Sequence, residues 1–508
     1  MFLPKLSFLS FLLASSGAAA VSIDAHYPHD PHTLSGCLLQ FRIETLLPSS
    51  ANFSTAIQPY NLRTGLGWVP TALVLPHTPQ EVAAAIRCAN KFNIKVAARS
   101  GGHSYGAYGL GGQNGSLVID LQNFNMLSVD PKTQIATIGA GVRLGDIATY
   151  LYNNGKRALP HGMCGGVGLG GHILHGGFGY TSRMWGITLD TVLSITAVIS
   201  TGQILTITSV SNPDLFWALR GAGSSFAIAT SFQLQTQPAP SNAIIFNYTF
   251  PSSTSIPDKV SLFEKAQEFA ATAPPELALR LMTRTASFPI VAEWQFVGAY
   301  WGSRGKFNEV IAPLLAAWPA DTHAEISEQK WLQALDTFAM SSIVPPHPYN
   351  IHDTFFAKSL TTSVPISNGS LSSFFTFLRD NSNAPVTWWV LGDLYGGKYS
   401  KIASKGPEDA SYAGRDALWT FQLYSVPKGF IPPYPSDGVE FMGRMHDSMT
   451  KVDGSSNWGA YPNYVDPTLA PREAHRLYYG SQYDRLREIK RRYDPEMRFW
   501  NPQAIGVE

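Results

Sequence analysis

Arg99-Ser-Gly-Gly-His-Ser-Tyr105 and Gly162-Met-Cys-Gly-Gly-Val-Gly-Leu-Gly-Gly171 are the two stretches of sequence that decide the fold. Consecutive glycines allow backbone N–H groups to approach a phosphate closely and to form anion-binding nests. Each stretch also carries one nucleophilic side chain, the imidazole of His103 or the thiol of Cys164. Either stretch alone is also compatible with a tight turn that holds an incidental histidine or cysteine. Neither stretch by itself therefore identifies a binding site.

The N-terminus resembles an export signal. Lys5 supplies a positive charge, Leu6 to Leu13 form a short apolar run, and Ala18-Ala-Ala20 offer small residues for cleavage. We therefore expect a signal peptide over residues 1–20 and a secreted mature chain that starts near Val21. The apolar run is too short to span a bilayer, and no later stretch is long enough. Sequons that suit glycosylation during export stand at Asn52, Asn114, Asn247 and Asn368.

The chain has only three cysteines, and an oxidising compartment favours pairing. Cys88 lies on a predicted amphipathic helix that starts at Pro79, and a disulfide with Cys37 would tie the N-terminal arm to that helix. Cys164 is then left over inside its glycine-rich stretch. Its sulfur is either a buried free thiol or is bonded to something other than cysteine.

Composition sets the protein class. The 508 residues are 44% hydrophobic and 14% charged, which is typical of a folded enzyme with two domains, or one large domain with an insertion. The net charge of +1 gives no reason to expect nucleic acid or an anionic membrane as a partner. Aromatic residues make up 12%, which suits stacking against ring-shaped ligands and equally suits a large core.

Strands and helices alternate from about Trp68 to the Gln237-Pro-Ala-Pro240 segment, and longer helices mixed with aromatic strands follow it. We place a domain boundary near residue 238. The strands that the patterns predict are 72–75, 95–98, 117–120, 135–139, 192–200 and 386–391. The predicted helices are the one that carries Cys88, 143–153, 261–272 and roughly 473–493.

Two motifs point to other folds. Gly166-Val-Gly-Leu-Gly-Gly171 matches a dinucleotide fingerprint, but its flanks do not form the strand and helix that this fingerprint needs. Gly102-His-Ser-Tyr-Gly106 matches a nucleophile elbow with Ser104 as the nucleophile of a serine hydrolase. The glycine-rich run after Ser104 is a poor helix former, so the hydrolase remains a distant alternative.

Taken together, the two stretches resemble the vanillyl-alcohol-oxidase or PCMH-type FAD-binding domain and, within it, the berberine-bridge-enzyme-like oxidases. The resemblance covers nearly the whole mature chain. It also rests on Val69-Pro-Thr-Ala72, Asp214-Leu-Phe-Trp-Ala-Leu-Arg-Gly-Ala-Gly223, Asn463-Tyr-Val-Asp466 and Tyr493-Asp-Pro495.

This resemblance implies an α+β fold in which FAD lies between two α+β subdomains. A separate substrate domain would contain a large antiparallel β-sheet covered by helices. The implied domains are 21–238 for FAD, with a core of about 67–238, then 239–460 for the substrate. Residues 461–508 would return to the FAD domain.

The resemblance also implies FAD held by two covalent bonds, from His103 to the flavin 8α-methyl and from Cys164 to ring carbon 6. That would explain the unpaired thiol, and two tethers should raise the flavin's redox potential. The other implied FAD contacts are Arg99, Ser100, Gly101, Gly102, Ser104, Gly162, Gly165, Val167, Gly168, Gly171, Ile228 and Asn501. No metal site is expected.

The chain is most similar to the fungal glucooligosaccharide and chitooligosaccharide oxidases, which oxidise the anomeric hydroxyl of a reducing-end sugar to a lactone and reduce O2. The resemblance implies that Tyr464 is the base and that Asp393 assists it. A tyrosine pKa is normally about 10, and a carboxylate that accepts the hydroxyl's hydrogen bond would oppose ionisation. We therefore expect the proton to leave in concert with hydride transfer.

Tyr105, Trp389 and Gln422 match sugar-contacting positions of these oxidases. Leu391 stands where relatives often carry a glutamine, which leaves open a berberine-bridge-like oxidase that acts on the alcohol of a secondary metabolite. The family's habit is monomeric. An electron acceptor other than O2 also remains possible.

Overall fold

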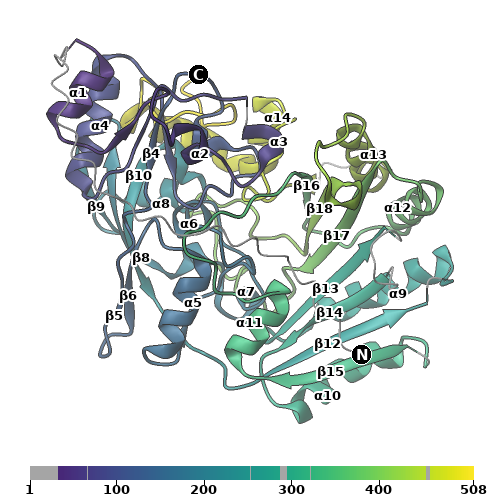
Figure 1. Cartoon of the computed structure of the whole chain (residues 1–508). Coiled ribbons are helices and arrows are strands. Elements are labelled where there is room, and N and C mark those ends of the chain that lie inside the picture. The colour runs from purple at the N-terminus through teal and green to yellow at the C-terminus, as the bar shows by residue number, and fades with distance from the viewer. Residues whose placement is uncertain (1–31, 66, 252, 286–293, 321, 453–457) are drawn as a thin grey trace, which may run out of the picture.

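Three large β-sheets organise the chain in a computed structural model that describes residues 32–65, 67–251, 253–285, 294–320, 322–452 and 458–508. The expected signal peptide, 1–20, lies outside these residues. Two of the sheets are built from the chain before residue 236, and the third from residues 243–459. Figure 1 shows the third sheet beside the other two, so the mixed α+β architecture expected from the sequence is confirmed.

A four-stranded sheet leads into the first glycine-rich stretch. Its order is β1-β2-β4-β3, in which β2, β3 and β4 are parallel and β1 is antiparallel. Every residue of β2 and β4 is buried, as expected for parallel strands that are covered on both faces. Because β3 ends at Arg99, the chain leaves the sheet directly into residues 100–105. The strands are β1 (Thr45–Leu46), β2 (Ala72–Val74), β3 (Val96–Arg99) and β4 (Leu117–Asp120).

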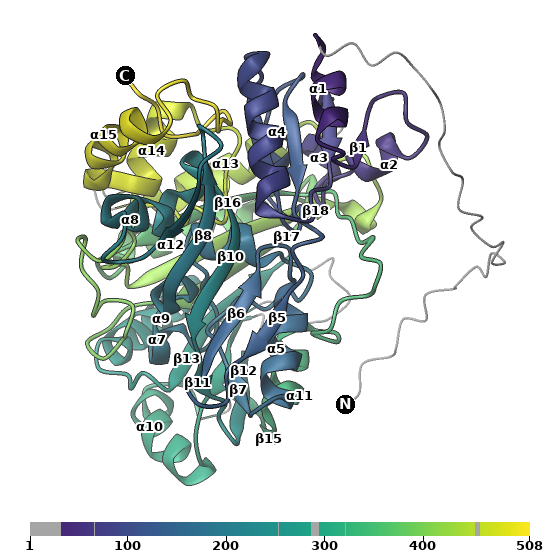
Figure 2. The same ribbon diagram turned by 90° about the vertical axis from the view of Figure 1, so that its left-hand side faces the viewer.

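An antiparallel five-stranded sheet packs next to it, in the order β5-β6-β10-β8-β9 (Figure 2). Helix α5 (Leu144–Asn153) follows β6, and the second glycine-rich stretch enters the six-residue helix α6 (Leu169–Leu174). The strands are β5 (Leu127–Val129), β6 (Ile135–Gly139), β8 (Val192–Ile199), β9 (Ile204–Ile207) and β10 (Ala227–Gln235). A two-residue pair, β7 (Arg157–Ala158) with β11 (Gln237–Pro238), closes this region.

The third sheet is antiparallel and has the order β15-β12-β14-β13-β17-β18-β16-β19. Successive side chains of a strand point to opposite faces, and one face packs into an aromatic core with α9 (Ile256–Ala270), α12 (Asn368–Asp380) and α13 (Gly438–Thr450). The strands are β12 (Ala243–Phe250), β13 (Leu277–Arg284), β14 (Trp294–Tyr300), β15 (His323–Gln329), β16 (Phe356–Thr362), β17 (Val386–Leu394), β18 (Trp419–Pro427) and β19 (Trp458–Gly459).

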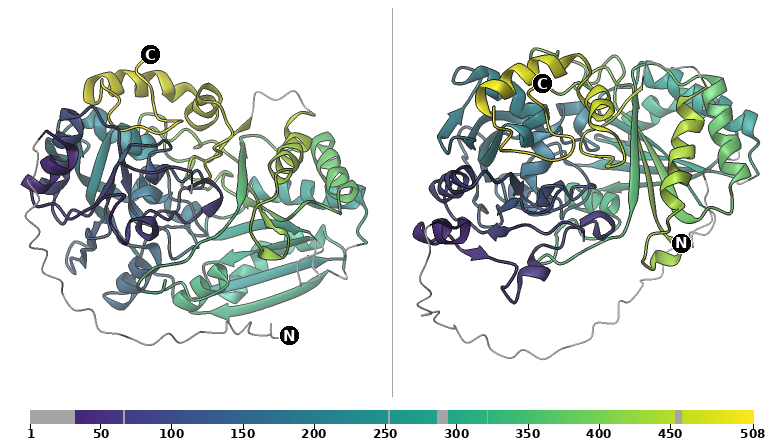
Figure 3. Two further views of the ribbon diagram at one scale, coloured as in Figure 1. Left: turned by 45° about the horizontal axis from the view of Figure 1, so that its top comes forward. Right: turned by 90° about the horizontal axis from the view of Figure 1, so that it is seen from above.

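The C-terminal segment lies across the first two sheets (Figure 3). The sequence predicted one helix over 473–493, but the structure has α14 (Pro471–Tyr479) and α15 (Tyr483–Tyr493), because Gly480 adopts a φ of 49° and ends α14. Beyond α15, Val96 of β3 forms a bridge with Phe499. The end of the chain therefore supports the strand that leads into the first glycine-rich stretch.

Other predicted elements differ from the structure mainly at their ends. Strands 117–120 and 135–139 are observed as predicted, and helix 143–153 begins one residue later, at Leu144. The helix expected from residue 261 starts earlier, at Ile256. The hydroxyl of Ser255 caps it by accepting a hydrogen bond from the N–H of Asp258 at 3.2 Å, a signal that the apolar periodicity did not reveal.

The sequons occupy different settings. Asn52, Asn114 and Asn368 are exposed, whereas Asn247 is half-buried in the middle of β12, where its amide donates to the Glu325 carboxylate at 3.4 Å. Among the described residues, no helix is both long and apolar enough to cross a membrane.

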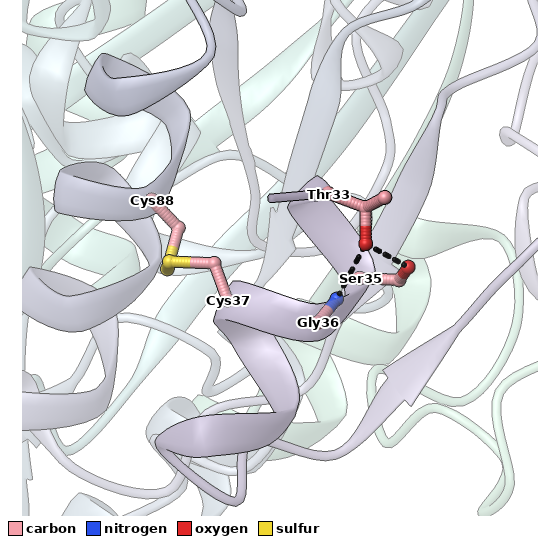
Figure 4. The surroundings of a disulfide bond; sticks show 5 residues. All are labelled: Thr33, Ser35, Gly36, Cys37 and Cys88. Atoms are coloured by element: carbon pink, nitrogen blue, oxygen red, sulfur yellow. Dashed lines mark hydrogen bonds between the residues drawn. A yellow bond between two sulfur atoms is a disulfide. The ribbon is translucent and has the colours of Figure 1, made fainter. Parts of the chain in front are cut away.

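Cys37 and Cys88 form the disulfide expected from the sequence (Figure 4). It joins α1 (Leu34–Gln40) to α4 (Pro79–Lys91), and both cysteines are buried. The bond closes a loop with a sequence separation of 51 residues, so it restricts the unfolded chain over that whole length.

We expect the variant C37A/C88A to lose about 2–4 kcal/mol of unfolding free energy, because the unfolded chain regains the entropy of that loop. Thermal and denaturant unfolding followed by circular dichroism would measure the loss. A reducing agent should destabilise the natural protein by a similar amount and leave the variant unaffected. Equal stability of the variant and the natural protein without reductant would contradict this expectation.

Candidate active site

The two glycine-rich stretches cross with their backbones in contact. A Cβ atom on Gly101 would lie 2.3 Å from the backbone nitrogen of Gly168, and one on Gly168 would lie 2.2 Å from the nitrogen of Gly101. No side chain fits at such distances, so the crossing requires glycine on both sides. Because His103 and Cys164 stand close to these positions in the sequence, the crossing brings the imidazole and the thiol into one site.

Polar side chains reinforce the crossing. The Arg143 guanidinium donates to the carbonyl of Gly101 at 3.3 Å and also to the carbonyl of Gly166. The Ser100 hydroxyl donates to the carbonyl of Ala140 at 2.6 Å and accepts from the N–H of Gly170 at 3.3 Å. Both stretches are thereby fixed to each other and to the segment between β6 and α5.

His103 is held between two tyrosines. Its ring stacks on Tyr60 with centroids 4.0 Å apart and planes 14° apart, and its Nε2 shares a 2.8 Å hydrogen bond with the Tyr349 hydroxyl. Burial, together with the nearby charge of Arg143 and His352, lowers the pKa of His103 to about 3. The imidazole is therefore neutral near pH 7 and can act as a nucleophile.

Cys164 is a free, exposed thiol. The atoms packed around it raise its pKa, while the N–H groups of Gly166 and Val167 and the Arg143 guanidinium act in the opposite direction. Those N–H groups and the guanidinium therefore favour the nucleophilic thiolate. A neutral imidazole and an unpaired thiol on touching loops form a donor set that fits covalent attachment of a flavin at two points.

Several residues expected to contact FAD make local structural bonds. Arg99 forms an ion pair with Asp120 at 2.5 Å, and the Ser104 hydroxyl accepts from the N–H of Tyr108 at 3.2 Å. The N–H of Gly162 donates to a ring nitrogen of His172 at 3.2 Å, and the Asn501 side chain accepts from the N–H of Gln503 at 2.9 Å. Of the remainder, Gly102 has a φ of 73°, Ile228 and Gly165 are buried, and a Cβ on Gly171 would meet no atom within 4 Å.

The motifs for other folds lack their structural context. The fingerprint-like run 166–171 follows a loop and not a strand, and its last residues already form the first turn of the short helix α6. After Ser104 the chain forms a 3₁₀ turn, Tyr108–Leu110, where a nucleophile elbow needs an α-helix.

A polar face of the third sheet supplies the other half of the site. Arg280 of β13 lies directly opposite Asp393 of β17, and Leu391 lies opposite Gln422 of β18. Residues two apart on a strand share a face, so Trp389, Leu391 and Asp393 all point away from the aromatic core. The pattern of β17 therefore places the predicted sugar-contacting and base-assisting residues together.

Arg280 and Asp393 form a buried two-point ion pair, with Nε to Oδ1 at 2.8 Å and Nη2 to Oδ2 at 3.0 Å. The Arg280 guanidinium also lies 4.9 Å from the ring centroid of Tyr180. Arg280 was not predicted from the sequence. The sequence feature that could have indicated Arg280 is a single arginine inside the apolar run Leu277-Ala-Leu-Arg-Leu281. Burial of its charge there costs free energy unless an opposite charge pairs with it.

Tyr464 comes from the C-terminal segment, and its ring lies parallel to that of Tyr105 with centroids 5.6 Å apart. Burial and the charge of Asp393 raise the pKa of Tyr464, and the charge of Arg280 opposes that rise. The hydrogen bond from Tyr464 to Asp393 that was considered from the sequence is not observed among the described residues. Among the described residues the side-chain hydrogen bonds of Asp393 come from Arg280, so the carboxylate acts on Tyr464 through its charge.

The predicted sugar contacts gather around these two rings. Gln422 donates from Nε2 to the Tyr105 hydroxyl, and Trp389 stacks on Tyr424 with centroids 4.6 Å apart. Since Tyr105 is two residues from His103, its stacking on Tyr464 connects the nucleophile loop to the C-terminal segment, and its hydrogen bond from Gln422 connects the loop to the sheet face. Residues from three separate parts of the chain therefore form one continuous site.

Family models match two regions of the chain. The model described as "FAD binding domain" covers residues 70–208, which include both glycine-rich stretches. The model described as "Berberine and berberine like" covers residues 460–506, which include Tyr464.

Curated relatives match almost the full length. The xylooligosaccharide oxidase of Thermothelomyces thermophilus is 36% identical and covers 96% of this chain and 97% of its own length. The chitooligosaccharide oxidase of Gibberella zeae is 33% identical over 94% of this chain and 95% of its own.

Solved structures agree in fold. The xylooligosaccharide oxidase from Myceliophthora thermophila C1 in complex with xylobiose has a TM-score of 0.87 at 36% identity, covering 94% of this chain and 99% of its own. The Acremonium strictum glucooligosaccharide oxidase, with a TM-score of 0.87 at 31% identity, covers 94% and 99%. Its description names a 6-S-cysteinyl, 8α-N1-histidyl FAD. By its sequence, its fold and its nucleophile pair, the present chain belongs to the berberine-bridge-enzyme-like family of FAD-linked oxidases, together with the fungal oligosaccharide oxidases.

Proposed function

We propose that this enzyme oxidises the anomeric hydroxyl of reducing-end oligosaccharides to a lactone, with FAD bound covalently to both His103 and Cys164. The proposal is carried by the contacts of Tyr105, whose ring stacks on Tyr464 and whose hydroxyl accepts a hydrogen bond from Gln422 of the third sheet, because they join the nucleophile loop to both the expected base and the polar sheet face. The names of the relatives support a sugar as substrate.

The cofactor's chemistry is acceptance of a hydride from the carbon that bears the hydroxyl. His103 and Cys164 would hold its ring from two sides, and the crossing of Gly101 over Gly168 sets the separation of these two side chains. Bound FAD would also supply the return of the two electrons to O2, which with two protons gives H2O2. Two tethers to the ring should raise its redox potential, so that it can accept hydride from a poor donor.

Tyr464 would remove the hydroxyl proton. Its raised pKa keeps the tyrosinate form scarce, and this form takes the substrate's proton as the hydride leaves, which returns Tyr464 to the neutral phenol. The Arg280 guanidinium sits beside the Asp393 carboxylate and limits how far that carboxylate raises the pKa of Tyr464. The ion pair therefore tunes the base without contacting the substrate.

The sugar would contact Trp389, Tyr105 and Gln422. Aromatic faces stack on the C–H groups of a pyranose, and Gln422 supplies a hydrogen-bonding amide. Leu391 lies beside Met282 of β13 and opposite Gln422, which makes that part of the face apolar. We infer a preference for sugars that present few hydroxyl groups at this point.

The same proposal includes export and a monomeric enzyme that uses O2. The buried Cys37–Cys88 disulfide and the exposed sequons support an oxidising, extracellular setting. Oxidation of a secondary-metabolite alcohol is the second candidate. It is favoured by the 33% identity to the FAD-linked oxidoreductase dpmaF of Metarhizium anisopliae.

A panel of reducing xylose-, glucose- and N-acetylglucosamine-based oligosaccharides, with peroxide release as the readout, separates the two candidates. We expect peroxide with at least one series and none with the same oligosaccharides after borohydride reduction, which removes the anomeric hydroxyl. Turnover of the reduced sugars would reject the anomeric hydroxyl as the reacting group, and turnover of no sugar in the panel would reject the carbohydrate assignment.

The amount of covalently bound flavin should depend on how many of the two attachment residues remain. His103→Ala and Cys164→Ala should each leave flavin in the acid-precipitated pellet through the remaining bond, and the double variant should release all of it. Each single variant should also have a lower flavin redox potential than the natural enzyme, because one constraint on the ring is lost. Flavin in the pellet of the double variant would place the attachment elsewhere.

The base can be tested separately from the cofactor. Tyr464→Phe should lower kcat by about 10²–10⁴-fold while covalent flavin stays complete, because only the proton acceptor is removed. Arg280→Met should also lower kcat, because Asp393 then raises the pKa of Tyr464 without compensation. A rate for Tyr464→Phe within a few-fold of the natural enzyme would exclude Tyr464 as the base.

A further inference from the structure

One loop of the substrate half reaches across to both glycine-rich stretches. We call residues 340–355, which join α11 (Trp331–Ala339) to β16, the strap. The carbonyl oxygen of Ile343 lies 1.7 Å from where a Cβ of Gly165 would be, and the Tyr349 hydroxyl lies 2.2 Å from where one on Gly166 would be. The strap therefore packs on the backbone that carries Cys164 as closely as glycine permits.

Tyr349 of the strap makes two further contacts. Its hydroxyl shares the 2.8 Å hydrogen bond with Nε2 of His103, and the Arg143 guanidinium lies 3.8 Å from its ring centroid. The same guanidinium donates to the carbonyls of Gly101 and Gly166. Tyr349 is thus the side chain that couples the imidazole to the residues fixing the loop crossing.

These contacts fix the His103 ring in two respects. Stacking on Tyr60 sets the plane of the ring, and the bond to Tyr349 sets its rotation within that plane. Among the described residues, no hydrogen bond engages Nδ1 of His103. The nitrogen with its lone pair available is therefore Nδ1, provided that Nε2 carries the proton and donates it to the Tyr349 hydroxyl.

We propose that Tyr349 is a positioning residue for flavin attachment, which selects Nδ1 of His103 as the bonding nitrogen by holding Nε2. The inference rests on the proposed attachment of FAD at His103 and adds to it a residue that no sequence motif indicates.

Attachment at Nδ1 is an oxidation of the flavin methyl group. A bond forms between Nδ1 and the 8α-methyl carbon of the flavin, the methyl group loses one hydrogen, and Nε2 loses its proton. The two electrons of the broken C–H bond reduce the flavin ring, and the two protons accompany them. O2, the electron acceptor of the oxidase, takes the two electrons and two protons and becomes H2O2.

The Tyr349 hydroxyl can hydrogen-bond to Nε2 of His103 both before and after attachment. Before attachment it accepts the proton of Nε2, and afterwards the same hydroxyl can donate to the lone pair that Nε2 has gained. Burial, followed by the charge of Cys164, raises the pKa of Tyr349, so the group remains a neutral hydroxyl. Arg143, stacked on the phenol ring, also helps to keep His103 uncharged.

Tyr349→Phe keeps the ring and its contact with Arg143 and removes only the hydroxyl. In the Cys164→Ala background, His103 is the sole tether. There we expect C164A/Y349F to gain covalent flavin up to about tenfold more slowly than C164A, since losing one such hydrogen bond slows attachment by that order. The measurement is the time course of flavin in the acid-precipitated pellet divided by total flavin of the enzyme.

The matched control is Y349F in the His103→Ala background, where Cys164 is the sole tether. H103A/Y349F should carry as much covalent flavin as H103A, which also shows that the variant folds and binds FAD. Equal rates of labelling in C164A/Y349F and C164A would overturn the role of Tyr349, as would a parallel loss in both backgrounds. Absence of covalent flavin from C164A itself would instead reject the His103 tether, and the role of Tyr349 with it.

Discussion

The backbone crossing of Gly101 over Gly168 is the constraint on which the site depends. At this point two segments meet more closely than any side chain would allow, and each places a nucleophile within a few residues of the contact. His103 and Cys164 lie far apart in the sequence, and this crossing brings them into one site. The hydrogen bonds of Arg143 and Ser100, the support of β3 by the C-terminal segment and the packing of residues 340–355 all act on this one crossing.

The chemistry of the second half depends on a buried charge pair. Burying an isolated carboxylate is costly, and Asp393 is tolerated because Arg280 opposite it on the neighbouring strand satisfies both oxygens. The same pair influences Tyr464, because one charge raises the pKa of the phenol and the other lowers it. In the proposed mechanism the glycine-rich stretches would position the cofactor and the pair on the third sheet would tune the base, and Tyr105 joins these parts by stacking on Tyr464 and accepting a hydrogen bond from Gln422.

The sequence predicted the features that lie within short stretches. His103 and Cys164 were predicted as flavin ligands from the resemblance that their two glycine-rich stretches carry together, the disulfide from an odd cysteine count, and most strands from local periodicity. Arg280 and Tyr349 were not predicted, because their partners are 113 and 246 residues away in the sequence. A hydrogen bond from Tyr464 to Asp393 is absent because Arg280 engages both carboxylate oxygens, which only the pairing of β13 with β17 reveals.

Mass spectrometry of a proteolytic digest of the natural enzyme tests the attachment of FAD at two points most directly. We expect a single flavin-containing species in which one FAD links the peptide that contains His103 to the peptide that contains Cys164. Fragmentation should place the flavin on those two side chains. Recovery of both peptides unmodified, with FAD free in solution, would contradict attachment at these residues.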